Sequence, residues 1–143
     1  MKRRIILTMI VVFCVGVFAN AVYLLNEIFP SAGEMRRPEI EEVVSVQLGY
    51  NTSDEMFPVN EQCYQDLSRY LIEAKSTRKQ SLNDCPTSRP YYKVEIQTRE
   101  RFYYYFVYKE GERVYIEIPY EGIYESKIEL LELVLNHFEE TCQ

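Results

Sequence analysis

The stretch YYKVEIQTRERFYYYFVYKEGERVYIEIPYEGIY, residues 91–124, decides the fold. It contains three consecutive runs, YYKVEIQT, RFYYYFVYK and ERVYIEIP, in which apolar or aromatic residues recur at every second position. A period of two with many β-branched and aromatic residues is typical of β-strands. Glu110 and Gly111 separate the second run from the third, and glycine accepts the positive φ of a tight hairpin turn. These runs predict an antiparallel meander of three strands.

The alternation also predicts two different faces for this meander. The expected apolar face carries Tyr92, Val94, Ile96, Phe102, Tyr104, Phe106, Tyr108, Val114, Ile116 and Ile118. The other face carries charged residues together with Tyr103, Tyr105 and Tyr115, which suits a half-solvated sheet. Tyrosine combines a large contact area with a hydroxyl group and only two side-chain torsions, so this tyrosine face predicts a recognition surface. Packing between tyrosines of neighbouring strands is the alternative.

The meander is expected to end at Pro119, because proline has no amide hydrogen with which to continue a ladder. Gly122 then allows the chain to turn sharply. Tyr120 and Tyr124 bracket this turn and are expected to tie it to the sheet. Ligand binding is the alternative role for these two tyrosines, and it would extend the recognition surface to the turn.

Periodicity on either side of the meander predicts the other elements of the domain. Residues 40–50 alternate apolar with polar side chains, which indicates a strand. Residues 60–77 repeat apolar side chains at helical spacing, and Asn60 suits the cap of that helix. Residues 78–90 are polar and contain prolines, as loops do, and residues 126–140 predict a second amphipathic helix. The predicted class is α+β, in the order strand, helix, three-stranded antiparallel meander, helix.

The N-terminus predicts a membrane segment. Basic residues occupy positions 2–4, and the next 21 residues, 5–25, carry no charge. About 20 apolar helical residues span a bilayer core, and the basic flank favours a cytoplasmic N-terminus. We therefore divide the chain into an anchor, a linker and an extracytoplasmic domain, at residues 1–28, 29–39 and 40–143. Ala19 and Ala21 form the small-x-small pattern that signal peptidase recognises, which leaves a cleaved signal peptide, and hence a secreted protein, as the alternative.

Composition and charge argue against several classes of function. The formal net charge is -6 without a basic cluster in the domain, which disfavours nucleic-acid binding. The single histidine, His137, lies near the end of the second predicted helix and does not support a serine or cysteine triad. The sequence has neither a zinc-type cysteine spacing nor a glycine-rich phosphate loop, so no metal or cofactor is predicted. A hydrolase that uses Glu117 or Glu121 is ranked last, because nothing in the sequence indicates the burial that would shift a carboxyl pKa.

The cysteines of the domain leave two interpretations open. An exported domain can form disulfides. Cys63 and Cys85 flank the first helix and the loop that follows it, so they are the preferred pair, and Cys142 would remain near the C-terminus. The alternative, equally compatible with the sequence, is that all of these cysteines are free thiols.

Two segments, TRKQSLNDCP at residues 77–86 and YKEGERVYIEIPYEGIYE at residues 108–125, together resemble a family of small extracytoplasmic domains of Firmicutes bacteria, the domain of unknown function DUF5301. The matching positions are Ser81, Asn83, Asp84, Pro86, Tyr115, Pro119, Tyr120, Gly122, Ile123 and Tyr124. The resemblance covers the predicted domain and excludes the anchor and the linker. It implies a fold and a location, in a single-anchor protein or a lipoprotein, and it implies no ligand.

We expect a membrane-anchored, extracytoplasmic, non-enzymatic recognition or sensing module. Its predicted ligand is a peptide or an envelope protein, bound through the tyrosine face. The alternative is an accessory subunit that packs on another membrane protein through its transmembrane helix. The carboxylate-dependent hydrolase is the third hypothesis.

Overall fold

The computed structural model describes residues 2–28, 30–51 and 53–141 and divides into two compact units, Met1–Ser31 and Ala32–Gln143. The first unit is the helix α1 (Lys2–Ile28). Its segment Arg4–Ile28 contains an 18-residue window with a mean hydropathy of 2.6, so it is long and apolar enough to cross a membrane. A signal sequence near the N-terminus has the same character.

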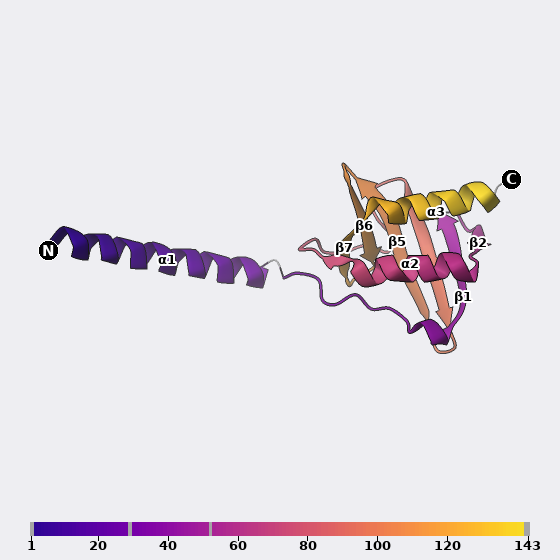
Figure 1. The fold of residues 1–143 in the computed structure, drawn as a ribbon, viewed down its shortest axis with the longest axis horizontal. Coiled ribbons are helices and arrows are strands. Elements are labelled where there is room, and N and C mark those ends of the chain that lie inside the picture. Colours follow the sequence, from indigo (N-terminus) through magenta and orange to yellow (C-terminus); the bar gives the residue numbers. More distant parts are fainter. Residues whose placement is uncertain (1, 29, 52, 142–143) are drawn as a thin grey trace. The chain divides into compact units, whose positions relative to one another are not determined.

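The second unit is an antiparallel sheet with helices on one face, so the predicted α+β class is confirmed (Figure 1). Its elements are η1 (Ile40–Glu42), β1 (Val43–Tyr50), β2 (Met56–Pro58), α2 (Glu61–Glu73), β3 (Lys75–Ser76), β4 (Tyr91–Thr98), β5 (Phe102–Glu110), β6 (Arg113–Ile118), β7 (Gly122–Ser126) and α3 (Ile128–Thr141). Within the described residues the sheet has seven strands in the order β2-β1-β4-β5-β6-β7-β3. The predicted order of elements is matched only roughly, because β7 extends the meander and the short strands β2 and β3 lie at its edges. Strands of two or three residues are too short to show a period in the sequence.

Local signals in the sequence account for several element ends. Gly111 takes a φ of 61° between β5 and β6, as the hairpin prediction requires. Asn60 caps α2, where its side-chain oxygen accepts a hydrogen bond of 2.8 Å from the amide of Cys63.

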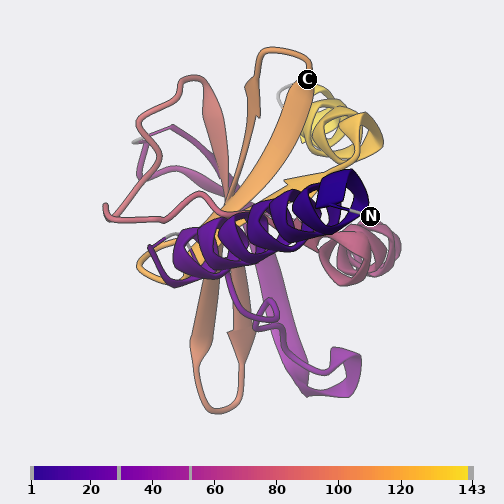
Figure 2. The same cartoon turned by 90° about the vertical axis from the view of Figure 1, so that its left-hand side faces the viewer.

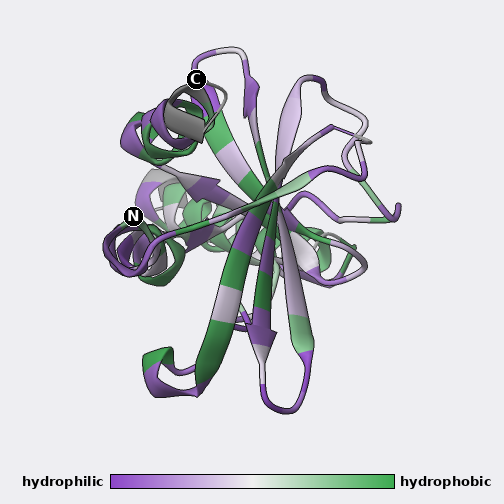
Figure 3. Ribbon diagram, turned by 90° about the vertical axis from the view of Figure 1, so that its right-hand side faces the viewer, coloured by the Kyte–Doolittle hydropathy of each residue, from purple (hydrophilic) through white to green (hydrophobic). Residues whose placement is uncertain are grey.

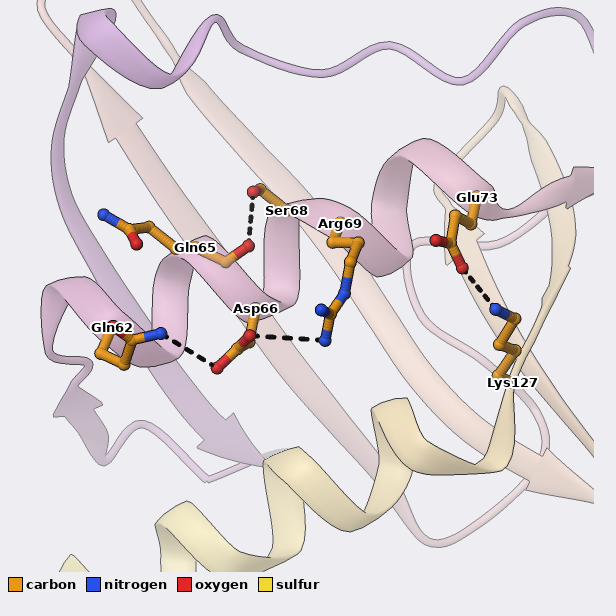
Figure 4. A network of polar contacts seen from close by, with 7 residues as sticks. All are labelled: Gln62, Gln65, Asp66, Ser68, Arg69, Glu73 and Lys127. Carbon is orange, nitrogen blue, oxygen red and sulfur yellow. Dashed lines mark hydrogen bonds and ion pairs between the residues drawn. The ribbon is translucent and has the colours of Figure 1, made fainter.

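The exposed face of α2 carries polar contacts (Figure 4), and the Lys127 Nζ reaches the Glu73 carboxylate at 2.5 Å. This contact ties the end of α2 to the residue that precedes α3.

Helices α2 and α3 lie on one face of the sheet and share a core with it (Figure 2). Figure 3 shows hydrophobic and hydrophilic residues alternating along the strands. The side chains buried between the sheet and these two helices form one cluster, which we call the helix-side core. It includes Val46, Leu48, Val94, Ile96, Tyr105, Val107 and Ile116 from the sheet and Tyr64, Leu67, Leu71, Leu130 and Val134 from the helices. Burial of these apolar side chains is the main stabilising contribution to the fold.

The opposite face of the sheet has a second, smaller core. We call it the loop-side cluster; its members are Tyr91, Phe106, Tyr108, Tyr115 and Ile123. Residues 77–90, which we call the docking loop, contribute Cys85 to its packing. The centre of the sheet is therefore buried on both faces.

The prediction that Tyr103, Tyr105 and Tyr115 share one face is wrong. Tyr105 is opposite Val94 in the β4–β5 register, so Tyr105 and Tyr103 face the helices, whereas Tyr115 belongs to the loop-side cluster. Strand β5 is apolar or aromatic at nearly every position, so its own alternation does not define which residues face the core. The register with β4 defines it, and a shift of one residue exchanges the faces.

Residues 32–38, which we call the strap, fall within the predicted linker but pack on the second unit. The amide of Ala32 donates to the carbonyl of Thr77 at 2.8 Å. Met35 is only 6% exposed and belongs to the helix-side core. The Tyr105 hydroxyl donates to the carbonyl of Arg36 at 2.8 Å. The folded unit thus begins at Ala32, inside the range predicted as linker; Phe29, also in that range, lies outside the described residues.

The turn after β6 agrees with the prediction at Pro119 and differs from it at Gly122. Strand β6 ends at Ile118, directly before the proline. Tyr120, rather than glycine, takes the positive φ of 62°, and the amide of Glu121 donates to the carbonyl of Ile118 at 3.1 Å. Gly122 is the first residue of β7, and a Cβ atom there would lie 2.4 Å from the Cβ of Ala32. The strap, and not the turn, is therefore the reason that position 122 has no room for a side chain.

Candidate functional site

The β-strand β5 is paired on both sides along only part of its length. Its register with β4 runs from Phe102 to Tyr108, whereas its register with β6 stops at Phe106, opposite Glu117. Pro119 follows the end of β6 and redirects the chain into the turn. In the part of the chain that the structure describes, no strand pairs with residues 102–105 on this side. We call these four residues the open end of β5.

A pocket of about 210 Å³ lies at the open end of β5. It is lined by Arg36, Arg101, Phe102, Tyr103, Tyr104, Tyr105, Ile118, Pro119 and Glu121. The lining thus combines a strip of strand, the residues that end β6, one residue of the strap and one of the turn. Concave sites lined mainly by aromatic and apolar groups, with a few polar groups, are typical of ligand binding.

Charged and aromatic side chains at the pocket are accessible to a ligand. The Arg36 Nη1 is 3.2 Å from the Glu121 Oε1, and 71% of the Arg36 side chain is exposed. Such an exposed ion pair is worth only about 0–1 kcal/mol and is easily exchanged for another. The Arg101 guanidinium lies 5.2 Å from the centre of the Tyr103 ring, within the range of a cation–π contact.

Two aromatic residues at the pocket, Phe102 and Tyr104, are among those that the sequence predicts on the apolar face of the meander. Phe102 and Tyr104 are 49% and 42% exposed, and their rings stack with centroids 6.3 Å apart. Sequence reasoning missed them because it assigned the wrong phase to β5. Exposed aromatic side chains beside an arginine are typical of binding surfaces.

The predicted binding tyrosines fall into different environments. Tyr103 and Tyr105 line the pocket. Tyr105 is buried, and its hydroxyl donates to the Arg36 carbonyl of the strap, so it stabilises the pocket without being accessible to a ligand. Burial is the main reason that the pKa of Tyr105 is raised far above its ordinary value. Tyr115 is covered by Lys79, whose Nζ lies 4.1 Å from the ring centre, and Tyr124 is 2% exposed in the helix-side core. The structure thus does not place these two at an accessible surface.

The remaining predicted tyrosine fastens the docking loop. Tyr120 is 66% exposed, and its hydroxyl donates to the Asp84 carboxylate at 2.7 Å. The Ser81 hydroxyl donates to the Glu117 Oε1 at 2.7 Å and lies 3.3 Å from the Tyr120 amide, from which it accepts. Pro86 is buried within the same loop, whereas Asn83 is exposed. Tyr120 therefore ties the turn to the docking loop, and only through Ser81 and Glu117 to the sheet to which the sequence predicted that it would bind.

The two candidate carboxylates do not form a pair. Glu117 is 5% exposed and is held by Ser81 under the docking loop. Burial, followed by the charge and hydrogen bond of Glu117, raises the pKa of Tyr108 above its ordinary value. Glu121 instead contacts Arg36 at the pocket. The structure therefore does not bring Glu117 and Glu121 together in one site.

Of the two alternatives for the cysteines, the described part of the chain shows no Cys63–Cys85 disulfide. Cys85 is a free thiol that packs against the loop-side cluster. Cys63 lies in the first turn of α2, on the helix-covered side of the sheet. The sheet therefore separates the two residues, and sequence spacing alone does not show this. Cys142 lies outside the described residues.

A family model and a solved structure match the domain. The model of the family DUF5301, described as "Domain of unknown function (DUF5300)", matches residues 31–125. The NMR structure of a protein from Ruminococcus gnavus is 30% identical and superposes with a TM-score of 0.53. The match covers 65% of this chain and 91% of that one. No curated protein matches.

Proposed function

The chain belongs to the DUF5301 family, and we propose that it is a membrane-anchored recognition module that binds an extended peptide or a segment of an envelope protein. One observation carries this proposal: the pocket lies beside a strip of strand that pairs with no described residue on one side. The function requires no chemistry at the site. It requires contact area, directional hydrogen bonds and complementary charge, which the open end of β5, the aromatic residues and the arginines supply.

We place the domain outside the cytoplasm of a bacterial cell, with α1 as the anchor. Residues 2–4 are basic, and such residues are retained on the cytoplasmic side of a membrane helix. The apolar segment Arg4–Ile28 has 25 residues, which exceeds the about 20 that a bilayer core needs. A signal peptidase cut within α1 would instead release the domain. The apparent mass of the mature protein in membrane and soluble fractions distinguishes these outcomes.

Site-specific photocrosslinking in cells tests the binding site. A photoreactive residue at Tyr104, which is 42% exposed beside the pocket, should give a discrete protein or peptide adduct. The same residue at Leu82, which is 71% exposed on the docking loop, is the matched control. Arg101→Ala should weaken the adduct formed from Tyr104. Labelling from Tyr104 that is absent, or equal to that from Leu82, would contradict the proposal.

A second candidate function is supported by a polar residue in α1. Asn20 lies within the apolar helix, and its Nδ2 donates to the Gly16 carbonyl at 3.1 Å. Amide side chains in membrane helices form hydrogen bonds to other helices, and glycine permits close approach. As an accessory subunit, the chain would pack on another membrane protein through this part of α1. Asn20→Leu should then abolish co-purification with that protein while leaving Tyr104 crosslinking unchanged.

A further inference from the structure

We infer that the ligand joins the sheet as an added strand along the open end of β5 and presents a carboxylate to Arg101. This inference rests on the proposed function and adds to it a binding mode and a ligand class, an extended acidic segment. The addition of a strand to an open sheet edge is a recurrent mode of peptide recognition. Main-chain hydrogen bonds supply affinity in that mode, and alternate side chains supply specificity.

The backbone of β5 shows which groups face the open side. The Thr98 amide donates to the Arg101 carbonyl at 2.9 Å, so the peptide groups of Arg101 point toward β4. Hydrogen-bonding groups alternate in direction along a strand. The amide and carbonyl of Phe102 and those of Tyr104 therefore point away from β4, toward the side where β6 is absent. No hydrogen bond to these groups occurs among the residues that the structure describes.

The pocket occupies the path that β6 would follow if it continued. It is bounded at one end by Ile118 and Pro119, where β6 stops, and along one side by the open end of β5. Pro119 lacks an amide hydrogen and begins the turn, so the described part of the chain does not continue β6 into this position. Most proteins protect such an edge with charge, proline or a covering segment. Here Pro119 and two arginines lie at the edge, and the exposed aromatic rings of Phe102 and Tyr104 lie beside them.

An added strand would contact both faces of β5. Side chains on one face of the ligand would pack against Phe102 and Tyr104, whose rings are stacked and exposed. Those on the other face would lie beside Tyr103 and Arg36, which line the pocket from the helix side. Cross-strand contacts with aromatic residues stabilise such pairs. Apolar or β-branched residues at alternate ligand positions fit the first surface.

The charge at the pocket favours an acidic ligand. Arg101 is exposed, and no ion pair to it occurs within the described part of the chain. Among the described residues that line the pocket, Arg36 is the second cation and Glu121 the only anion, so the pocket is locally positive. The surrounding chain is acidic, since residues 29–143 contain 13 basic and 21 acidic residues. This local reversal of charge selects a carboxylate-bearing segment.

Peptide selection on the full chain in detergent micelles tests the inference. Random linear peptides displayed on phage would be panned against this protein, with an Arg36, Tyr103 and Tyr104 triple alanine variant as the counter-selection. We expect enriched peptides that carry an acidic residue next to β-branched residues. Arg101→Glu should weaken their binding about tenfold or more, the size expected for a charge-assisted hydrogen bond. Arg113→Glu, at the far end of the β5–β6 hairpin, should leave their binding unchanged.

Backbone modification tests the added strand itself. N-methylation of the synthesised peptides should weaken binding about tenfold at every second position and have little effect at the positions between them, because only alternate amides face β5. Phe102→Pro removes an amide that is not used in the β4 ladder, so it should weaken binding about fivefold more than Phe102→Ala. Proline is tolerated at the first residue of a strand, and both variants should fold.

The outcomes separate the inference from the proposed function. Peptides that need Tyr103 and Tyr104 but are insensitive to N-methylation would overturn the added strand and leave the recognition site standing. Enrichment of basic peptides would overturn the assignment of an acidic ligand. If no peptide is enriched over the triple alanine variant, both the inference and the proposed function are wrong.

Discussion

Substitution of Gly122 by alanine should detach the strap, and the structure gives the size of the effect. The new Cβ atom would lie 2.4 Å from the Cβ of Ala32, whereas carbon atoms in contact are about 3.5–4.0 Å apart. One of the two backbones must therefore move by more than about 1 Å. Overpacking of this kind costs about 1–3 kcal/mol. Alanine recovers about 0.5–1 kcal/mol of backbone entropy relative to glycine in a strand, so the middle of the two ranges gives a net loss of about 1 kcal/mol.

A double-mutant cycle isolates this contact from other effects. In the Ala32→Gly background, the next atoms that the Cβ of residue 122 meets are the Cα of residue 32 at 3.5 Å and the Tyr124 hydroxyl at 3.6 Å. These are ordinary contacts, so Gly122→Ala should then be neutral or slightly stabilising. The coupling free energy should be about 1–3 kcal/mol. Gly33→Ala is the matched control, because a Cβ at Gly33 would meet no atom within 4 Å.

Urea unfolding of the full chain in detergent micelles measures these differences. The chain has 13 tyrosines and no tryptophan, so near-ultraviolet circular dichroism of the tyrosines reports tertiary structure. Because Arg36 belongs to the strap, Gly122→Ala should also weaken binding of the selected peptides, and Ala32→Gly should restore it. Additive effects of the two substitutions would refute the reasoning. So would a Gly122→Ala protein as stable as the original.

Three other predictions follow from buried polar groups and the free thiol. Burial raises the folded-state pKa of Tyr105 and Tyr108 above 10.0. Their neutral forms therefore stabilise the fold below pH 10.0, and this stabilisation is lost as the pH rises above 10.0. The urea midpoint should fall in that range, and less steeply in the Tyr105→Phe and Tyr108→Phe variants. Ser81→Ala should cost about 1–3 kcal/mol, because it leaves the buried Glu117 carboxylate without that donor, and equal urea midpoints would contradict this. Cys85 should react with a thiol reagent after unfolding without any reductant, and mass spectrometry showing a disulfide at Cys85 would contradict its assignment as a free thiol.

Most elements of the domain could be predicted because their signals are local. The alternation in β4 and β6, the cap at Asn60 and the glycine at position 111 each depend on a few adjacent residues. The phase of β5 could not be predicted, because aromatic residues occupy both of its faces. Only the pairing of Tyr105 with Val94 determines that phase, and pairing is a property of two strands together.

The candidate site depends on the same non-local information. Pro119 indicates that β6 ends, but not how far along β5 it ends. The pocket exists because β5 extends four residues, 102–105, beyond the last pair with β6. Arg36 could not be assigned to the site either, since it lies in a segment with the proline, glycine and mixed charge of a linker. Its position follows from a buried methionine at position 35 and one hydrogen bond from Tyr105.

The strap contributes to both the fold and the candidate site. It begins at Ala32, four residues after α1 ends at Ile28, and the family match begins at residue 31 and ends at residue 125. The matched range therefore contains the strap, the docking loop and the pocket residues, and it leaves out α1 and α3. A segment that served only as a flexible connection would not need a glycine facing it at position 122 or a buried side chain at position 35. Because Arg36 lines the pocket, the strap completes the candidate site as well as the fold, and separation of the strap from the sheet should affect stability and binding together.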